Sequence, residues 1–230
     1  MDPRKLFVDE RHALYCVYCG NSPGTDEHVP SKAFLDEPYP DNLRVVRSCE
    51  ACNNGFSRDE EYVAVALECA ARRTVDPALV QRPKVARKLR GTPKLAKRIL
   101  FNTSPPDLSG DQRVSLERER VERVVLKLAR GHAAYEFGEP QLDEPTEVWF
   151  RPLTELSAAE RALFESPQRQ FVLPEIGSRA FLNAVSSAGE LLEQDWHVVQ
   201  KGRYRYLTSP GPFLVRLVIG EYLAAEVHWQ

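Results

Sequence analysis

The feature that most constrains this chain is a pair of Cys-x-x-Cys motifs near its N-terminus, Cys16-Val-Tyr-Cys19 and Cys49-Glu-Ala-Cys52. Each such turn presents two thiolates to one side of a tetrahedral ion, so the two turns together predict a structural zinc site. The fifth cysteine, Cys69, stands outside the pattern. Two disulfides, or four unrelated core thiols, are the alternatives. The start of the chain is polar and no apolar stretch is long enough to span a bilayer, so we expect a cytoplasmic location without membrane association. In that reducing compartment, paired thiols bind metal more often than they form disulfides.

Charge is distributed unevenly along the 230 residues. The net charge is −2, but the segment between Asp76 and Asp107 holds eight basic residues and no acidic one. A local basic stripe is what binding to a phosphate backbone requires, and a solvated helical face is the alternative reading. The nucleic-acid-binding candidates in this stripe are Arg82, Lys84, Arg87, Lys88, Lys94, Lys97 and Arg98.

The pattern of apolar and turn-forming residues predicts an α+β fold. We expect helices over 59–73, 84–100 (with a break near Gly91-Thr92-Pro93), 117–136, 157–165 and 177–189. Strands are expected over 146–151, 196–200, 203–208, 213–219 and 223–229, joined partly by glycine-containing turns. The predicted organisation is a small zinc-stapled module at 1–60 followed by a larger domain of helices and antiparallel sheet at 61–230. The hydrophobic content of 43% is in the range of globular proteins.

A second group of residues between and after the cysteines suggests catalysis. Glu27 and Asn53 offer carboxylate and amide oxygens, which are hard ligands suited to Mg²⁺ or Mn²⁺. The imidazole of His28 has an ordinary pKa near 6.5 and can take a proton from water at physiological pH. Thiolates are soft and prefer zinc, so one small module can keep two metals in separate sites. A zinc-stapled fold with a separate catalytic metal site is typical of a nuclease.

In order along the chain, Cys16-x-x-Cys19, Glu27-His28-Val29-Pro30, Asn42 and Cys49-x-x-Cys52-Asn53 resemble the zinc-containing branch of the HNH endonucleases, the ββα-metal nucleases. The resemblance covers about residues 13–60. It implies two short strands, Thr25–Val29 and Leu43–Ser48, and a helix beginning near Asn53, wrapped around one catalytic divalent ion. The four cysteines would hold a structural zinc that replaces a hydrophobic core.

The resemblance also implies a role for each matching residue. His28 falls on the general base, Glu27 on the metal-binding carboxylate before it, and Asn53 on the second metal ligand. Asn42 falls on the residue that fixes the loop and orients the base by a hydrogen bond. Glu27 departs from the usual Asp by one methylene, and Asn54 competes with Asn53 for the ligand position.

Two classes of function follow. The first is a metal-dependent endonuclease that hydrolyses phosphodiester bonds in DNA, with RNA as another possible substrate; nucleases of this type occur in phage, mobile elements and bacterial defence systems. The second is a zinc-stabilised nucleic-acid-binding adaptor or degenerate nuclease, in which Glu27 and His28 are an exposed loop pair. The part of the chain after residue 60 carries no motif that we can interpret, and it is a possible surface for a protein partner.

Overall fold

The structure, a computed structural model, describes residues 14–166, 192–193, 196–210 and 213–230. It begins with the hairpin of β1 (Thr25–Val29) and β2 (Arg44–Ser48), which flank a short 3-10 helix, η3 (Lys32–Phe34). Four helices follow: α1 (Glu50–Arg72), α2 (Pro83–Gly91), α3 (Pro93–Phe101) and α4 (Arg118–Phe137). The rest comprises β3 (Glu147–Pro152), η4 (Leu153–Glu155), α5 (Ala158–Glu165), β4 (Leu192–Glu193), β5 (Trp196–Gln200), β6 (Tyr204–Pro210), β7 (Phe213–Ile219) and β8 (Leu223–His228).

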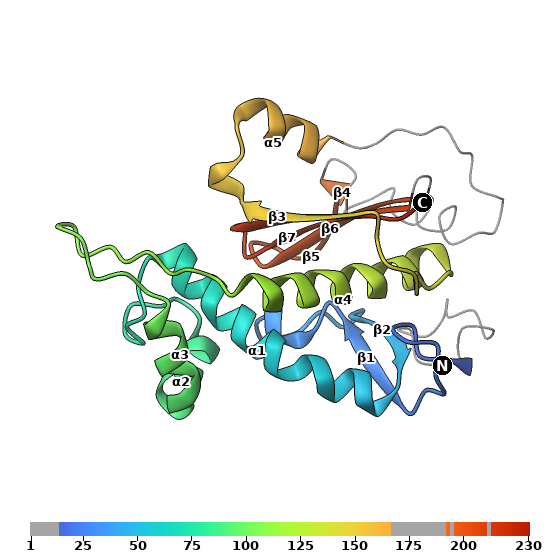
Figure 1. Cartoon of the computed structure of the whole chain (residues 1–230), viewed down its shortest axis with the longest axis horizontal. Helices are drawn as coiled ribbons and strands as arrows, with labels where there is room; N and C mark the ends of the chain where they lie inside the picture. Colours follow the sequence, from blue (N-terminus) through green and yellow to red (C-terminus); the bar gives the residue numbers. More distant parts are fainter. Residues whose placement is uncertain (1–13, 167–191, 194–195, 211–212) are drawn as a thin grey trace.

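The larger sheet has six strands in the order β3-β8-β7-β6-β5-β4, and every neighbouring pair is antiparallel. Successive strand residues face opposite sides, so each strand contributes to two layers. Leu217 of β7 packs into the main core on the side of α4, whereas its neighbour Val218 packs with Phe164 of α5. Figure 1 shows α4 across one face of this sheet and α5 on the other. The predicted α+β class is confirmed.

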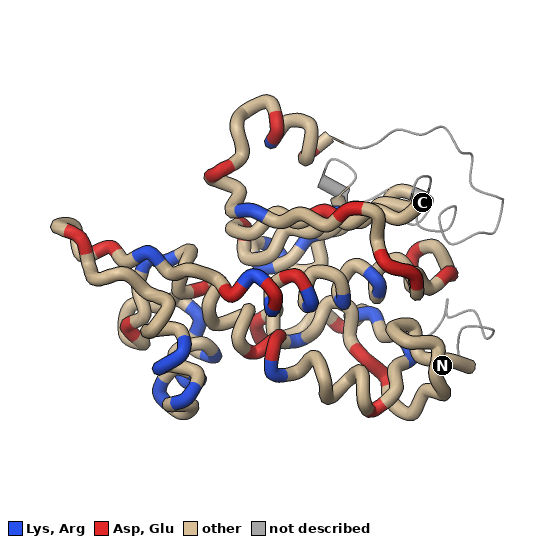
Figure 2. The backbone as a smooth tube through the Cα atoms, in the orientation of Figure 1, with Lys and Arg blue, Asp and Glu red and all other residues tan. Residues whose placement is uncertain are grey.

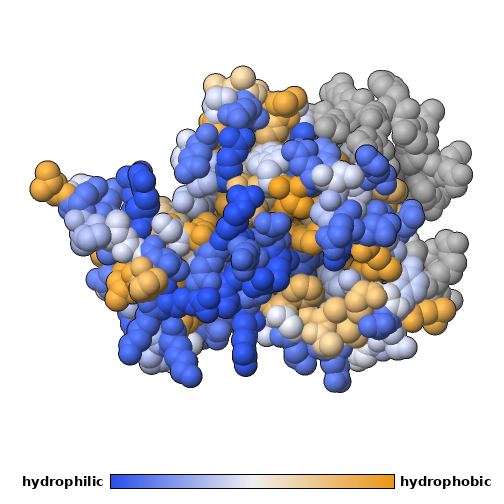
Figure 3. Space-filling model, viewed as in Figure 1, coloured by the Kyte–Doolittle hydropathy of each residue, from blue (hydrophilic) through white to orange (hydrophobic). Residues whose placement is uncertain are grey.

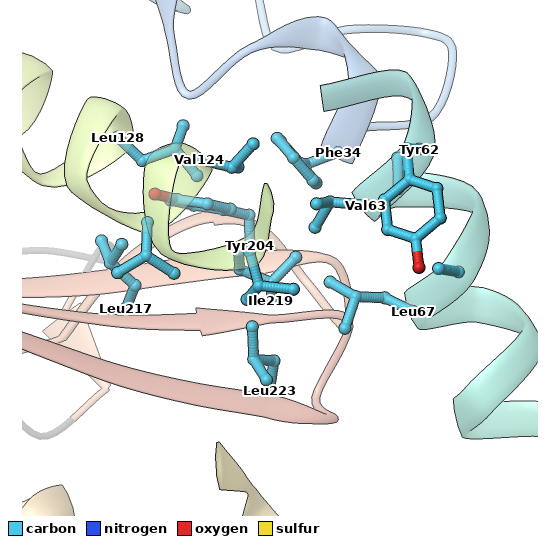
Figure 4. Close-up of a cluster of buried hydrophobic side chains, with 14 of the residues drawn as sticks. Phe34, Tyr62, Val63, Leu67, Val124, Leu128, Tyr204, Leu217, Ile219 and Leu223 are labelled. Atoms are coloured by element: carbon cyan, nitrogen blue, oxygen red, sulfur yellow. The ribbon is translucent and has the colours of Figure 1, made fainter. Parts of the chain in front are cut away.

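One hydrophobic core joins the hairpin region to the sheet. Phe34 of η3, Val63 of α1, Val124 of α4 and Ile219 of β7 are all buried in the same cluster, and Figure 4 shows these side chains converging from three layers. The expected domain boundary after residue 60 falls inside α1. Phe34 precedes that boundary and Val63 follows it, so side chains from both sides pack in the same core.

The start of α1 differs from the expectation. The acidic residues at 59–61 favour a helix start at residue 59, whereas the resemblance implies a start near Asn53. The helix begins at Glu50, closer to the second of these, where the Cys49 side chain accepts a hydrogen bond from the Cys52 amide. Asp59 instead binds Arg123 of α4 at 2.8 Å between Nε and Oδ2, and it also pairs with Arg120. The acids that resembled a helix start in fact hold two helices together.

The other element predictions hold closely. The basic stretch forms α2 and α3 with a break at Thr92, and the helix over 117–136 appears as α4. All five of the expected longer strands are present, and α5 matches the helix over 157–165. The helix expected over 177–189 lies outside the described residues. None of the helices in the described part of the chain combines the length and the apolar character that crossing a bilayer requires.

Two histidines lie where α4 meets the sheet, His132 buried and His197 half-buried. His132 of α4 lies with Nε2 2.9 Å from the Tyr204 hydroxyl, and its ring stacks on Tyr206 with 3.7 Å between centroids. His197 of β5 also stacks on Tyr206, at 4.9 Å. Burial lowers the pKa of His197 to about 4, with a further contribution from the nearby Arg44, and burial holds the pKa of His132 well below 6.5. Both rings are thus neutral in the folded protein, a structural role.

This interface predicts acid sensitivity. In the unfolded chain His197 titrates near 6.5, so below that pH the unfolded state binds a proton that the folded state binds only near pH 4. The stability that the neutral His197 contributes is therefore complete above about pH 6.5 and is lost as the pH falls toward 4. This contribution to the unfolding free energy is on the order of 3 kcal/mol. We expect His197→Phe, which keeps an aromatic ring against Tyr206, to flatten the decline measured by urea unfolding between pH 7 and pH 4.5. Parallel declines for the two proteins would contradict this assignment.

Candidate metal centre

The four cysteines of the two motifs converge on one point. Cys16 and Cys19 lie in the turn before β1, Cys49 caps α1 and Cys52 lies in its first turn. Their four Sγ atoms lie within 4.8 Å of one another, and Cys19 and Cys49 are 3.7 Å apart. A tetrahedral site with metal–sulfur bonds of about 2.3 Å places its sulfurs about 3.8 Å apart. This cluster can therefore hold a metal ion such as zinc.

Local backbone contacts set the first turn in place. The Gly20 amide donates to the Cys16 carbonyl at 2.8 Å, and Gly20 has a φ of 75°, a conformation that glycine adopts without strain. The Val17 amide donates to the Arg47 carbonyl of β2 at 3.0 Å. The hairpin thus carries one cysteine pair to the helix end that bears the other.

The close spacing of the four cysteines affects how readily each thiol ionises. Burial opposes ionisation of Cys16, but hydrogen bonds from neighbouring groups bring its pKa down to about 7. The pKa of Cys52 is raised by burial and by the adjacent Cys49 and Cys19 sulfurs, and burial also raises the pKa of Cys19. Four thiolates at this spacing repel one another, so a bound divalent cation is the natural way to stabilise them together.

The cysteine cluster packs directly on α4. Tyr18 and Val29 form a small apolar cluster with Ala134 and Tyr135 of that helix. A Cβ added at Gly131 would lie only 2.9 Å from a methyl of Val29. Glycine in a helix interior costs about 1 kcal/mol relative to alanine, and here it permits the close approach of the hairpin.

A buried lysine occupies the space beside Glu27. The Lys127 ammonium of α4 donates to Glu27 Oε1 at 2.6 Å and to Glu60 Oε1 of α1 at 2.5 Å. The exposed fractions are only 2% for Lys127, 9% for Glu27 and 6% for Glu60. Burial raises the pKa of Glu27, and the Lys127 charge opposes that rise. Ser31 completes the group by donating to Glu60 Oε2 at 3.1 Å.

The structure brings Glu27 and Asn53 to one face of the hairpin. The Asn53 amide donates to the Thr25 hydroxyl at 3.0 Å, and Thr25 and Glu27 share a face because they are two residues apart on β1. Lys127 uses Oε1 of Glu27, and Asn53 donates through its nitrogen. Oε2 of Glu27 and Oδ1 of Asn53 make no hydrogen bond to a described residue. Asn54 is exposed.

His28 and Asn42 lie elsewhere. His28 is half-buried and lies opposite Val45, on the face of β1 that is shared with Asp26. Asp26 pairs across the hairpin with Arg47 at 2.5 Å. Asn42 is exposed in the turn before β2, where its side chain makes no hydrogen bond to a described residue. The structure therefore does not bring Asn42 and His28 together through a hydrogen bond.

The basic stripe divides into two sets. Arg82 was expected to contact nucleic acid, and this assignment is corrected. Its side chain is 5% exposed, and it binds Asp36 at 2.8 Å and the Leu35 carbonyl at 3.0 Å. Lys84 is half-buried and donates to the carbonyls of Lys32 and Leu35. These two side chains hold the loop after η3 against α2.

The remaining candidates of the stripe are exposed: Arg87, Lys88, Lys94, Lys97 and Arg98. Lys88 pairs with Glu61, and Arg98 pairs with Glu117. Figure 2 shows several basic positions along the backbone of α2 and α3, and Figure 3 shows hydrophilic residues at this end of the molecule with some hydrophobic ones between them.

Sequence reasoning missed Lys127 and Glu60. A signal was present for the lysine: it stands three residues after Val124 and four before Gly131, so it shares their helix face. A lysine on the packed face of a helix requires buried carboxylates as partners.

Comparisons of the chain with family models, with curated proteins and with solved structures find no match.

The cysteine cluster makes a direct prediction about metal content. We expect elemental analysis of the purified protein to find about one zinc per chain, and Cys19→Ser to lose most of it, because structural sites bind with on the order of 10 kcal/mol and depend on every ligand. Cys69→Ser is the matched control: the chemical change is the same, but Cys69 is buried in the main core. Zinc content that is equal in all three proteins, or absent from the wild type, would contradict the site.

Proposed function

We propose that this chain is a metal-dependent endonuclease of the HNH type, a hydrolase of phosphodiester bonds in DNA, with RNA as the other possible substrate. The local arrangement of the hairpin, the helix and the cysteine cluster is the observation that best supports this proposal. A two-stranded hairpin and a helix meet at the cysteine cluster, and the Asn53 amide of α1 donates to Thr25, which shares a face of β1 with Glu27. The resemblance implies a hairpin and a helix around a catalytic ion, and this arrangement supports the proposal.

The residues divide the chemistry between them. Glu27 and Asn53 would hold Mg²⁺ or Mn²⁺, which supplies positive charge for the scissile phosphate and the departing oxygen. His28 takes a proton from the attacking water. Glu27 and His28 are successive residues of β1 and lie on opposite faces of the strand, so they would approach one phosphate from different sides. Asn42, exposed in the loop, would reach His28 only after the loop moves.

Lys127 sets the charge of this site. It holds Glu27 toward the face of α1, and its ammonium favours the ionised carboxylate that metal binding requires. The same ammonium repels a divalent ion, so we expect weak metal affinity and a need for millimolar Mg²⁺ or Mn²⁺.

The exposed lysine and arginine side chains of α2 and α3 support a nucleic-acid substrate. Arg87, Lys94 and Lys97 have no ion-pair partner among the described residues. They lie on α2, which packs beside α1, and on α3, which packs on α2. Phosphate contacts of this kind give affinity without sequence preference.

One observation favours a second candidate, a zinc-stabilised nucleic-acid-binding adaptor or degenerate nuclease. Lys127 already neutralises Glu27, and Glu60 shares the same ammonium. In an adaptor this ion group would serve the fold alone, and no divalent ion would be needed.

Cleavage assays separate the two candidates. We expect the protein to cleave plasmid or single-stranded DNA with Mg²⁺ or Mn²⁺, and His28→Ala to lower the rate by about 10²–10⁴-fold without changing zinc content or DNA affinity. Glu27→Gln and Asn53→Ala should instead weaken the divalent ion, so part of their loss should return at high Mn²⁺. Asn54→Ala is the matched control for Asn53→Ala, because it removes the same side-chain amide from the next position of α1, where Asn54 is exposed. Wild-type cleavage by the His28→Ala protein would contradict the mechanism and favour the adaptor.

A further inference from the structure

A pocket beside the candidate site has no role in the function proposed so far. It encloses about 430 Å³ between η3, α1 and α2. Pockets that bind small molecules begin at about 300 Å³, so this one is large enough for a single nucleotide but not for a duplex.

The pocket has an apolar wall. Ala64 and Val65 of α1 and Val85 of α2 line it, and each of these side chains belongs to the main core. These three side chains are only 6%, 2% and 2% exposed, so they close the bottom of the pocket, where an apolar surface offers nothing to a bare phosphate ion.

Basic side chains surround this wall. Lys32, Arg58, Lys84 and Lys88 line the pocket. Lys84 is already used by the loop carbonyls, whereas Lys32 and Arg58 are exposed, and Arg58 has no ion-pair partner among the described residues. Lys32 lies over the Tyr39 ring at 5.1 Å, a contact that leaves its ammonium open to an anion.

Two carboxylates also line the pocket. Glu61 pairs with Lys88, and Glu60 shares the Lys127 ammonium with Glu27. Four basic and two acidic side chains line the pocket, so the lining carries a net positive charge.

The pocket adjoins the candidate catalytic residues along α1. Asn53 and Ser57 are four residues apart on one helix face, about 6 Å along the axis, and Ser57 lines the pocket. Glu60, another lining residue, shares the Lys127 ammonium with Glu27. A strand that placed a phosphate between Glu27 and Asn53 would thus present its next nucleotides to the pocket.

We propose that this pocket binds one unpaired nucleotide of the substrate strand, with its base between η3, α1 and α2 and its phosphate at Lys32 and Arg58. The proposal rests on the proposed function and extends it, because an unpaired nucleotide implies a single-stranded or locally opened substrate. Figure 2 shows the basic α2–α3 region, which would continue the path of the backbone beyond the pocket.

The test uses the zinc-loaded full chain without added divalent ion, so binding is separate from cleavage. The probes are a deoxynucleoside 5′-monophosphate, the corresponding deoxynucleoside and inorganic phosphate, with affinities measured by calorimetry. We expect the monophosphate to bind at least about tenfold more tightly than either part alone. Lys32→Ala with Arg58→Ala should weaken it about tenfold or more. The control pair Arg113→Ala with Arg161→Ala removes the same number of exposed basic residues outside the pocket and should change little.

Three outcomes would overturn the proposal: no binding of the monophosphate, equal binding of inorganic phosphate, or equal weakening by the two variant pairs. Plasmid and single-strand cleavage, measured separately with Mg²⁺ or Mn²⁺, reports on the proposed function. Cleavage that persists while the monophosphate fails to bind would reject the pocket alone. Binding without cleavage would support the pocket and reject the nuclease.

Discussion

The structure depends on one buried charge. Lys127 carries its ammonium into the space between β1, α1 and α4, where Glu27 and Glu60 receive it at 2.6 and 2.5 Å. Desolvating such groups is expensive, and removing one partner from a buried ion pair typically costs about 3–5 kcal/mol because the other charge is left uncompensated. The group therefore fixes how the hairpin sits on the two helices. The candidate metal-binding carboxylate and the core of the protein are held by the same lysine.

The cysteine cluster and the core are joined by a single helix. Cys49 and Cys52 are in the first turn of α1, and Tyr62 and Val63 of the same helix are buried in the main core. A rigid helix transmits the position of the cluster to the sheet, and Gly131 lets α4 approach the hairpin closely. The small module is thus an integral part of the fold. Its two expected metals would occupy different neighbourhoods, one among thiolates and one among oxygens near an ammonium.

Much of this architecture could be predicted from sequence because its patterns are local. The spacing of the cysteines specifies one cluster, and alternating apolar residues specify the strands from 146 onward. What failed was the assignment of charged residues to the surface. Arg82 lies on the buried face of α2, which carries Val85, Ala86 and Leu89. A run of basic residues in the sequence does not show which of its members face the interior. The partners of Lys127 lie 100 and 67 positions away in the chain, so no local pattern could pair them.

The most direct test of this account measures the unfolding free energy of Lys127→Met by urea titration at pH 7. Removal of the ammonium should cost several kcal/mol, because Glu27 and Glu60 would share a buried site without a cation. Adding Glu27→Gln and Glu60→Gln to the same protein should restore most of that loss, because all three buried charges are then gone. A Lys127→Met protein as stable as the wild type, or a triple variant no more stable than the single one, would contradict the claim that this ion group holds the fold.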